Sequence, residues 1–382
     1  MGSSELGVDQ DDAVTRALRA LSDRMPWPVA KATLQALGLH VSTGWATSIE
    51  RQDIFDPSSE QHRLLVEKLS SIYQQHTLVG EKMVRWYSLT GIPASIEKSF
   101  SAAVCAAPNT VEVIRDSKFH DTYPFPVRDS DSLKSLEELG PVLSAVFERD
   151  GKTVFHYSSV RSYRDRVELS PESFSENDRE RLKQYEEIYA VLPIRRQCDD
   201  AIVFNHESKL MEIRVDAPYG MSVEEVSLAA QAVAGEFNTL AASTFGYSPF
   251  GENAISFFSA IDPMYRNSSE GKVYELGFMA TATGSTSNNQ GKLVRGKNRD
   301  LRKDAFHVGG SSAVQEITPY RIGVEWSGNG LDGAPQLIIP GTMRMLHKSP
   351  INVPEAFVRH CASEKDFAFV TNRLRNYIFK KK

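Results

Sequence analysis

The densest group of positive side chains lies between Gly284 and Gly310, a stretch rich in glycine, serine and asparagine. From Lys292 to Asp304 it holds six cations and two carboxylates, which gives +4 locally in a chain of formal net charge −5. Glycines let a ligand approach the backbone, and guanidinium groups bind phosphate through a planar fork. The predicted ligand-binding residues are Lys292, Arg295, Lys297, Arg299, Arg302, Lys303 and His307.

A short helix is expected inside this basic segment, with Asn298 as its cap. Helical spacing then places Arg299, Arg302 and Lys303 on one face. A helix N-terminus beside three cations is suited to the phosphate of a nucleic acid, a nucleotide or a phospholipid. The alternative interpretation is a solvated run of charge on a loop.

A second group of polar residues suggests catalysis. Asp200 precedes one predicted strand, and Glu212 and Arg214 lie on one face of the next. Carboxylates placed in this way hold Mg²⁺ beside the scissile phosphate in metal-dependent nucleases and phosphodiesterases. Arg214 stands where such sites carry lysine, and arginine does not lose its proton to act as a base. A row of charges on the solvent face of a hairpin explains the same pattern.

No complete cofactor or metal motif accompanies these residues. Gly328 to Gly333 spells a dinucleotide fingerprint, but Ala334-Pro335 and a predicted strand follow where a helix is required. The nine histidines show no zinc spacing. We therefore expect neither a metal nor a cofactor, with Mg²⁺ required only under the nuclease alternative.

The clearest structural signal runs from Ala201 to Thr244. Two short apolar or alternating runs up to Asp216 predict a β-hairpin, and Ser222 with Glu225 predicts the capping box of a long helix. Asp150-Gly151 predicts the turn of another hairpin. Further expected elements are a charged surface helix over 177–189, strands over 272–283 and 320–327, and a final helix capped by Ser363.

Up to residue 107, every periodic segment is interpreted as helical, with a fourth helix broken at Gly91. Residues 30–51 have the spacing of a helix-turn-helix, but Arg51 is the only cation on its second helix, so helical packing or protein docking explains it better. The sequence thus predicts an α+β fold, with a helical domain over 1–107 and a mostly antiparallel sheet domain over 108–382.

Composition narrows the class of protein. The sequence has 382 residues, is 41% hydrophobic, has no apolar run of bilayer length, and has three widely spaced cysteines. We expect a cytoplasmic protein without membrane contact, and a binding or adaptor protein more readily than an enzyme. Its ligand carries phosphate, most simply as nucleic acid, and its helical domain docks a protein partner or a second copy. The remaining alternative is a structural subunit of an assembly, with prokaryotic antiviral defence as a speculative setting.

Overall fold

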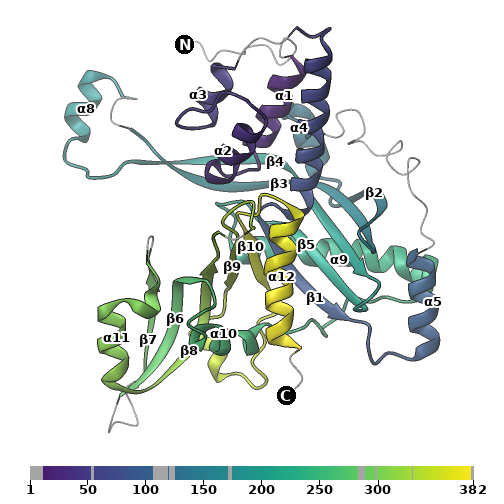
Figure 1. The fold of residues 1–382 in the computed structure, drawn as a ribbon, viewed down its shortest axis with the longest axis vertical. Coiled ribbons are helices and arrows are strands. Elements are labelled where there is room, and N and C mark those ends of the chain that lie inside the picture. The colour runs from purple at the N-terminus through teal and green to yellow at the C-terminus, as the bar shows by residue number, and fades with distance from the viewer. Residues whose placement is uncertain are drawn as a thin grey trace.

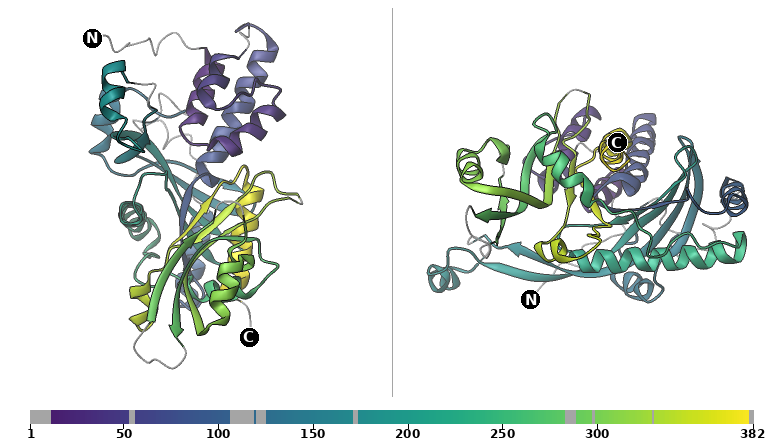
Figure 2. Two further views of the ribbon diagram at one scale, coloured as in Figure 1. Left: turned by 90° about the vertical axis from the view of Figure 1, so that its left-hand side faces the viewer. Right: turned by 90° about the horizontal axis from the view of Figure 1, so that it is seen from below.

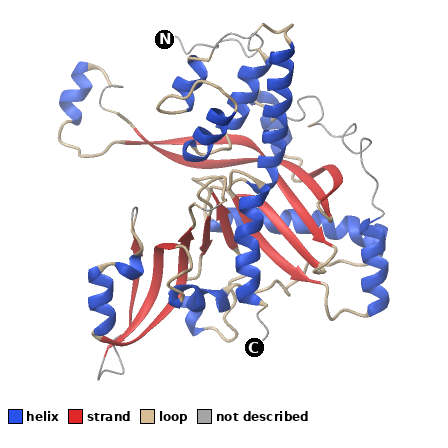
Figure 3. Cartoon of the chain, viewed as in Figure 1, coloured by secondary structure: helices blue, strands red, loops and turns tan. Residues whose placement is uncertain are grey.

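The computed structural model describes residues 12–52, 56–105, 119, 125–170, 174–282, 289–296, 299–328 and 330–379. N-terminal helices precede an antiparallel sheet that carries helices on both faces (Figures 1 and 3). The predicted α+β class is therefore confirmed. The domain boundary at residue 107 stays a prediction.

The N-terminal helices pack into a bundle around a core that includes Leu18, Leu34 and Leu69. Trp45 belongs to this core, since its indole N–H donates to the Met25 carbonyl at 2.8 Å. The expected helix-turn-helix segment therefore consists of two helices packed within the bundle, and Gly44 caps the second. The four helices are α1 (Ala13–Ser22), α2 (Trp27–Ala36), α3 (Trp45–Glu50) and α4 (Glu60–Val79).

All ten described strands join one sheet in the order β2-β3-β4-β5-β1-β10-β9-β8-β6-β7. Every neighbouring pair is antiparallel. The strands are β1 (Lys82–Ser88), β2 (Val142–Arg149), β3 (Lys152–Glu168), β4 (Tyr189–Asn205), β5 (Leu210–Asp216), β6 (Lys272–Ala282), β7 (Asn289–Arg295), β8 (Val314–Glu325), β9 (Gln336–Ile339) and β10 (Ala356–Arg359).

The prediction of a helix ending at Gly91 is wrong, because β1 occupies the centre of the sheet between β5 and β10. Val84 and Trp86 pack into the core on one face, while Met83 and Tyr87 pack on the other. A strand buried on both faces has no alternation of apolar and polar residues, so its sequence lacks the signal that identifies a half-exposed strand.

Helices cover both faces of the sheet centre. Phe237 of α9 and Phe100 of α5 belong to the core on one face. Met264 of α10 and Phe367 of α12 belong to the core on the other face, and Figure 2 (right) shows α9 and α12 on opposite sides of the sheet. The helices are α5 (Ala94–Cys105), α9 (Val223–Phe245), α10 (Phe258–Arg266) and α12 (Glu364–Ile378), and the capping box of α9 and the Ser363 cap of α12 are confirmed.

The two halves of the sheet repeat one order of elements. On one side of β1, the meander β2-β3-β4-β5 leads into α9, and on the other side β8-β9-β10 leads into α12. Strand β6 pairs with β8 as β2 pairs with β3, and β7 is added outside β6. The two halves meet at β1. This is the strand that the apolar pattern of the sequence failed to predict.

The long strands β3 and β4 extend away from the sheet as an arm that leads to α8 (Glu176–Leu182) (Figure 1). The helix predicted over 177–189 is thus too long. Helix α8 has no buried residue, and strand β4 already begins at Tyr189. The hairpin turn at Asp150-Gly151 is confirmed, with φ of 49° and 69°. The remaining helical elements are α7 (Ser130–Glu137), α11 (Ala305–Ser312) and the 3₁₀ turns η3 (Leu301–Lys303) and η4 (Met343–His347).

The polar face of β5 is buried, and not exposed as the hairpin pattern suggested. The two oxygens of the Asp216 carboxylate accept hydrogen bonds from Arg24 Nη2 at 2.7 Å, and one of them also accepts from Lys82 Nζ at 2.5 Å. Arg24 also donates to Asp199 at 2.8 Å. Burial alone would raise the pKa of the Asp216 carboxyl, but Arg24 and Lys82 outweigh it and hold that pKa well below its usual range. This cluster joins the end of α1 to β1, β4 and β5.

Replacing Asp216 by asparagine is expected to lower the free energy of unfolding by about 3–5 kcal/mol, because it removes the carboxylate paired with the buried Lys82 and leaves Arg24 with Asp199 alone. Urea unfolding of the variant measures this. The control is Glu67→Gln, which breaks the exposed pair with Arg63 and should cost about 0.5 kcal/mol or less. Equal losses in the two variants would contradict the role given to the cluster.

Stability is also expected to fall in mild acid because of His76 on α4. Burial, together with the cations of Arg24 and Lys82, lowers the pKa of His76 to about 3. The ordinary histidine value is about 6.5, so between these values the unfolded chain binds a proton that the native state does not. The free energy of unfolding should therefore fall as the pH drops from about 6.5 toward 3, by about 1.4 kcal/mol per pH unit from this residue.

Urea titrations from pH 7.5 to 4.5 test this expectation. His76→Phe should flatten the dependence by one proton, and His347→Gln, at an exposed position, is the control for loss of a histidine. An unchanged slope in His76→Phe would show that His76 is not the titrating group.

Candidate functional site

In the described part of the predicted basic segment, a strand and a three-residue 3₁₀ turn are found, and the expected short helix is not. Lys292 and Arg295 lie on β7 at the edge of the sheet, and Arg295 pairs with Glu275 at 2.8 Å. Arg299 is 76% exposed and pairs with Asp304 at 2.9 Å. Lys297 and Asn298 lie outside the described residues. The short turn η3 is capped by Asp300, and it is only three residues long.

Arg302 has its donors satisfied within the protein. Its guanidinium bonds to the Asp300 carboxylate at 2.7 Å and to the backbone carbonyls of Asn267, Glu270 and Gly271. It therefore fixes the chain after α10. Lys303 is exposed, and His307 on α11 shares a hydrogen bond of 2.9 Å with the Tyr265 hydroxyl. The predicted residues are thus spread over β7, η3 and α11, and the three arginines among them are paired with carboxylates.

The candidate catalytic residues lie on opposite faces of the sheet. Ala201 and Arg214 face each other in the ladder, so the pleat places Asp200 on the face away from Glu212 and Arg214. Asp200 bonds to Arg161, and Glu212 accepts from Arg214 at 3.0 Å. Within the described part of the chain, no three His, Cys, Asp or Glu side chains are grouped to hold a metal ion. No arrangement for two-carboxylate Mg²⁺ chemistry is therefore visible there.

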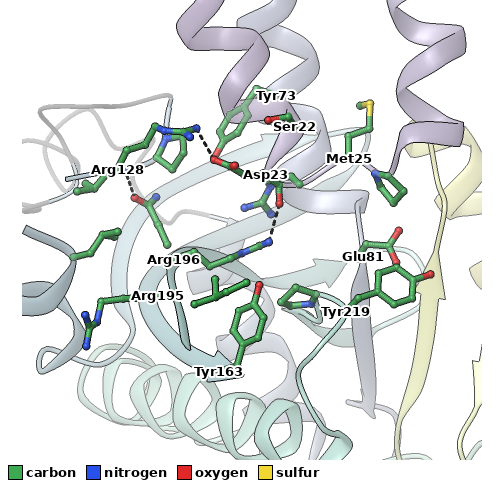
Figure 4. Close-up of a pocket in the computed structure, with 18 residues that line it drawn as sticks. Ser22, Asp23, Met25, Tyr73, Glu81, Arg128, Tyr163, Arg195, Arg196 and Tyr219 are labelled. Carbon is green, nitrogen blue, oxygen red and sulfur yellow. Dashed lines mark hydrogen bonds and ion pairs between the residues drawn. The ribbon is translucent and has the colours of Figure 1, made fainter. Parts of the chain in front are cut away.

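A pocket of about 470 Å³ lies where the helical bundle meets the sheet (Figure 4). This volume is within the range of about 300–1,000 Å³ that holds small ligands. The end of α1, Tyr73 of α4, the start of β1, the base of the β3–β4 arm and the segment after β5 all contribute to its wall. Its charged and aromatic lining residues are Asp23, Arg24, Tyr73, Glu81, Arg128, Tyr163, Arg195, Arg196 and Tyr219.

Three of the four arginines in this wall have carboxylate partners. Arg24 bonds to Asp199 and Asp216, as described above. Arg128 pairs with Asp23 at 2.5 Å. Arg195 pairs with Glu137 at 2.7 Å.

Arg196 differs from them, because its one bond found among the described residues is to the Asp23 backbone carbonyl at 2.7 Å. The guanidinium is partly buried and has no ion pair among the described residues, so an anion in the pocket would offset the cost of its desolvation.

Two further donors in the wall are without acceptors among the described residues. The Tyr73 side chain is 1% exposed, and its hydroxyl has no hydrogen-bond partner there. Burial raises the pKa of Tyr73 well above its usual range, so the hydroxyl keeps its proton and remains a donor. Arg24 Nε is also buried without a partner. Together with Arg196, these donors form a site that matches a ligand rich in acceptor oxygens.

None of these pocket residues was singled out from the sequence. The available signal is the pair Arg195-Arg196, which interrupts an apolar run shortly before Asp199-Asp200. Tyr73 and Arg24 carry no such signal, because each lies in an ordinary helical stretch. Only the docking of the bundle on the sheet brings them together.

No protein-family model matches the chain, and no curated protein matches it significantly. Across the described residues, no helix combines the length and the apolar content needed to cross a bilayer. What the chain binds must therefore be inferred from the geometry of its own site.

Tyr73→Phe is expected to leave the unliganded protein as stable as the wild type, or up to about 1 kcal/mol more stable, because it removes a buried hydroxyl that has no partner. Tyr377→Phe is the matched control. The Tyr377 hydroxyl donates to Glu270 at 2.7 Å, so its loss should cost about 1 kcal/mol. Thermal or urea unfolding measures both. Equal costs would show that the Tyr73 hydroxyl has a bonding partner in the native state.

Proposed function

We propose that the protein is a binding protein for a phosphate-bearing ligand, and that the phosphate occupies the pocket between bundle and sheet. The observation that carries this proposal is Arg196, a partly buried guanidinium in the pocket wall whose described hydrogen-bond partner is a backbone carbonyl. Phosphate supplies the missing charge and several acceptor oxygens for the Tyr73 hydroxyl and Arg24 Nε. The ionic cluster beneath the pocket holds Arg24 in place.

The ligand class is the one expected from the sequence, but a different site supports it best. In the basic segment, Arg295, Arg299 and Arg302 already have carboxylate partners. Exposed cations of this kind still attract nucleic acid at low salt. The segment is therefore the second candidate, and the two sites are separable by substitution.

Calorimetric titration with inorganic phosphate and with pyrophosphate tests the pocket. Arg196→Ala should weaken binding at least about 10-fold, because a hydrogen bond to a charged group contributes about 1.5–3 kcal/mol. Tyr73→Phe should weaken it less, with the fold intact. The double variant Arg299→Ala/Lys303→Ala, which alters the basic segment and leaves Arg302 in place, should bind like the wild type.

The same proteins are then measured against labelled single- and double-stranded DNA and RNA at two salt concentrations, with Mg²⁺ present. Loss of binding only in the double variant would move the phosphate site to the basic segment. Shortening of a probe would reveal a nuclease. Absence of all binding at low salt would overturn the proposal and favour a structural subunit in a protein assembly.

A further inference from the structure

The end of the pocket away from Arg128 and Arg195 has the opposite chemistry. Figure 4 shows Glu81 and Tyr219 at that end. The Glu81 side chain is 8% exposed, and its Oε1 accepts from the His360 backbone N–H at 2.9 Å. Its Oε2 is buried without a hydrogen-bond donor among the described residues, and Arg359 Nη1 is 3.6 Å away. The contact with Arg359 is an ion pair too long to be a hydrogen bond, so Oε2 keeps the capacity to accept an N–H.

Tyr219 adds a flat apolar surface beside this oxygen. Its ring is 55% exposed although it lines the pocket. The Arg359 guanidinium lies 4.3 Å from the ring centroid, and the ring hydroxyl shares a hydrogen bond of 3.1 Å with His360 Nε2. The ring is thus fixed in place while much of it stays accessible. Such rings serve as stacking platforms for nucleobases.

We infer that the ligand is a nucleotide whose base carries an exocyclic amino group, as adenine and cytosine do. This inference rests on the proposed phosphate site. The phosphate lies at the donors Arg196, Tyr73 and Arg24, the base stacks on Tyr219, and the amino group donates to Glu81 Oε2. Because Oε1 already accepts from the backbone, the carboxylate suits a single amino donor better than the paired donors of guanine.

Paired nucleotides that differ only at this group test the inference. AMP and CMP present an amino group where IMP and UMP present a carbonyl oxygen. Calorimetry on the full chain should give AMP at least about 10-fold tighter binding than IMP, and CMP tighter binding than UMP, because a carbonyl facing Glu81 would leave the carboxylate unpaired against a second acceptor. Ribose 5-phosphate, which lacks the base, should bind more weakly than AMP.

Glu81→Gln should abolish or reverse the preference, because an amide whose oxygen accepts the His360 N–H presents its NH₂ group to the base. The amide oxygen can still accept the His360 N–H, so the fold is retained, and a thermal melt checks this. Glu60→Gln, at an exposed position on α4, is the matched control and should keep the preference. Comparing the affinity for AMP with that for an oligonucleotide that begins with 5′-phosphoadenosine shows whether the ligand is a free nucleotide or the 5′ end of a strand.

The outcomes separate this inference from the phosphate proposal. If AMP and IMP bind equally well, and both bind more weakly to Arg196→Ala, the inferred preference for an amino-bearing base is wrong. The proposed phosphate site would then still hold. A preference that survives Glu81→Gln would likewise overturn the inferred contact between the base and Glu81. No binding of any nucleotide, of inorganic phosphate or of pyrophosphate by the wild-type chain would overturn both.

Discussion

The rest of the structure depends on the burial of the Asp216 carboxylate beside two cations. Arg24 enters from the end of α1 and Lys82 from the start of β1, and both donate to the same carboxylate. Lys82 also donates to the Asp199 carbonyl, and the Asp199 N–H donates to Asp216. Buried charges are tolerated only when they are paired and hydrogen-bonded. This requirement fixes where the helical bundle sits on the sheet.

The cluster extends across the sheet as a polar network. Ser158 on β3 donates to Asp199, and Ser144 on β2 bonds to His156 Nδ1 at 2.7 Å. The network thus touches β1, β5, β4, β3 and β2, and the apolar cores lie around it. Because each member has a fixed partner, the surface above the network has little freedom to rearrange. A ligand site formed from these elements is preorganised.

The pocket lies at the edge of this rigid region. Arg24 belongs to both, because it lines the pocket while two of its nitrogens bind the cluster and its buried Nε has no partner among the described residues. The same docking that satisfies Asp216 buries the Tyr73 hydroxyl and part of Arg196. The two ends of the pocket differ in what they lack, since one has donors without acceptors and the other has a carboxylate oxygen without a donor. Under the proposed function, that difference would give a polar ligand one orientation in the pocket.

Local signals in the sequence determined much of the secondary structure. Turn chemistry at Asp150-Gly151, the capping box at Ser222 and alternation along β5 each act within a few residues, so the hairpins and α9 could be predicted. Where the apolar pattern had no period, as in β1, the prediction failed, because burial on both faces is a property of the assembled sheet. The polar face of β5 was misjudged for the same reason, since alternation shows which side chains share a face but not what covers it. The candidate site in the pocket depends most of all on tertiary structure. Arg24, Tyr73, Glu81 and Arg196 come from four separate segments, and only tertiary packing brings them around one pocket and leaves polar atoms of the first three buried without hydrogen-bond partners among the described residues.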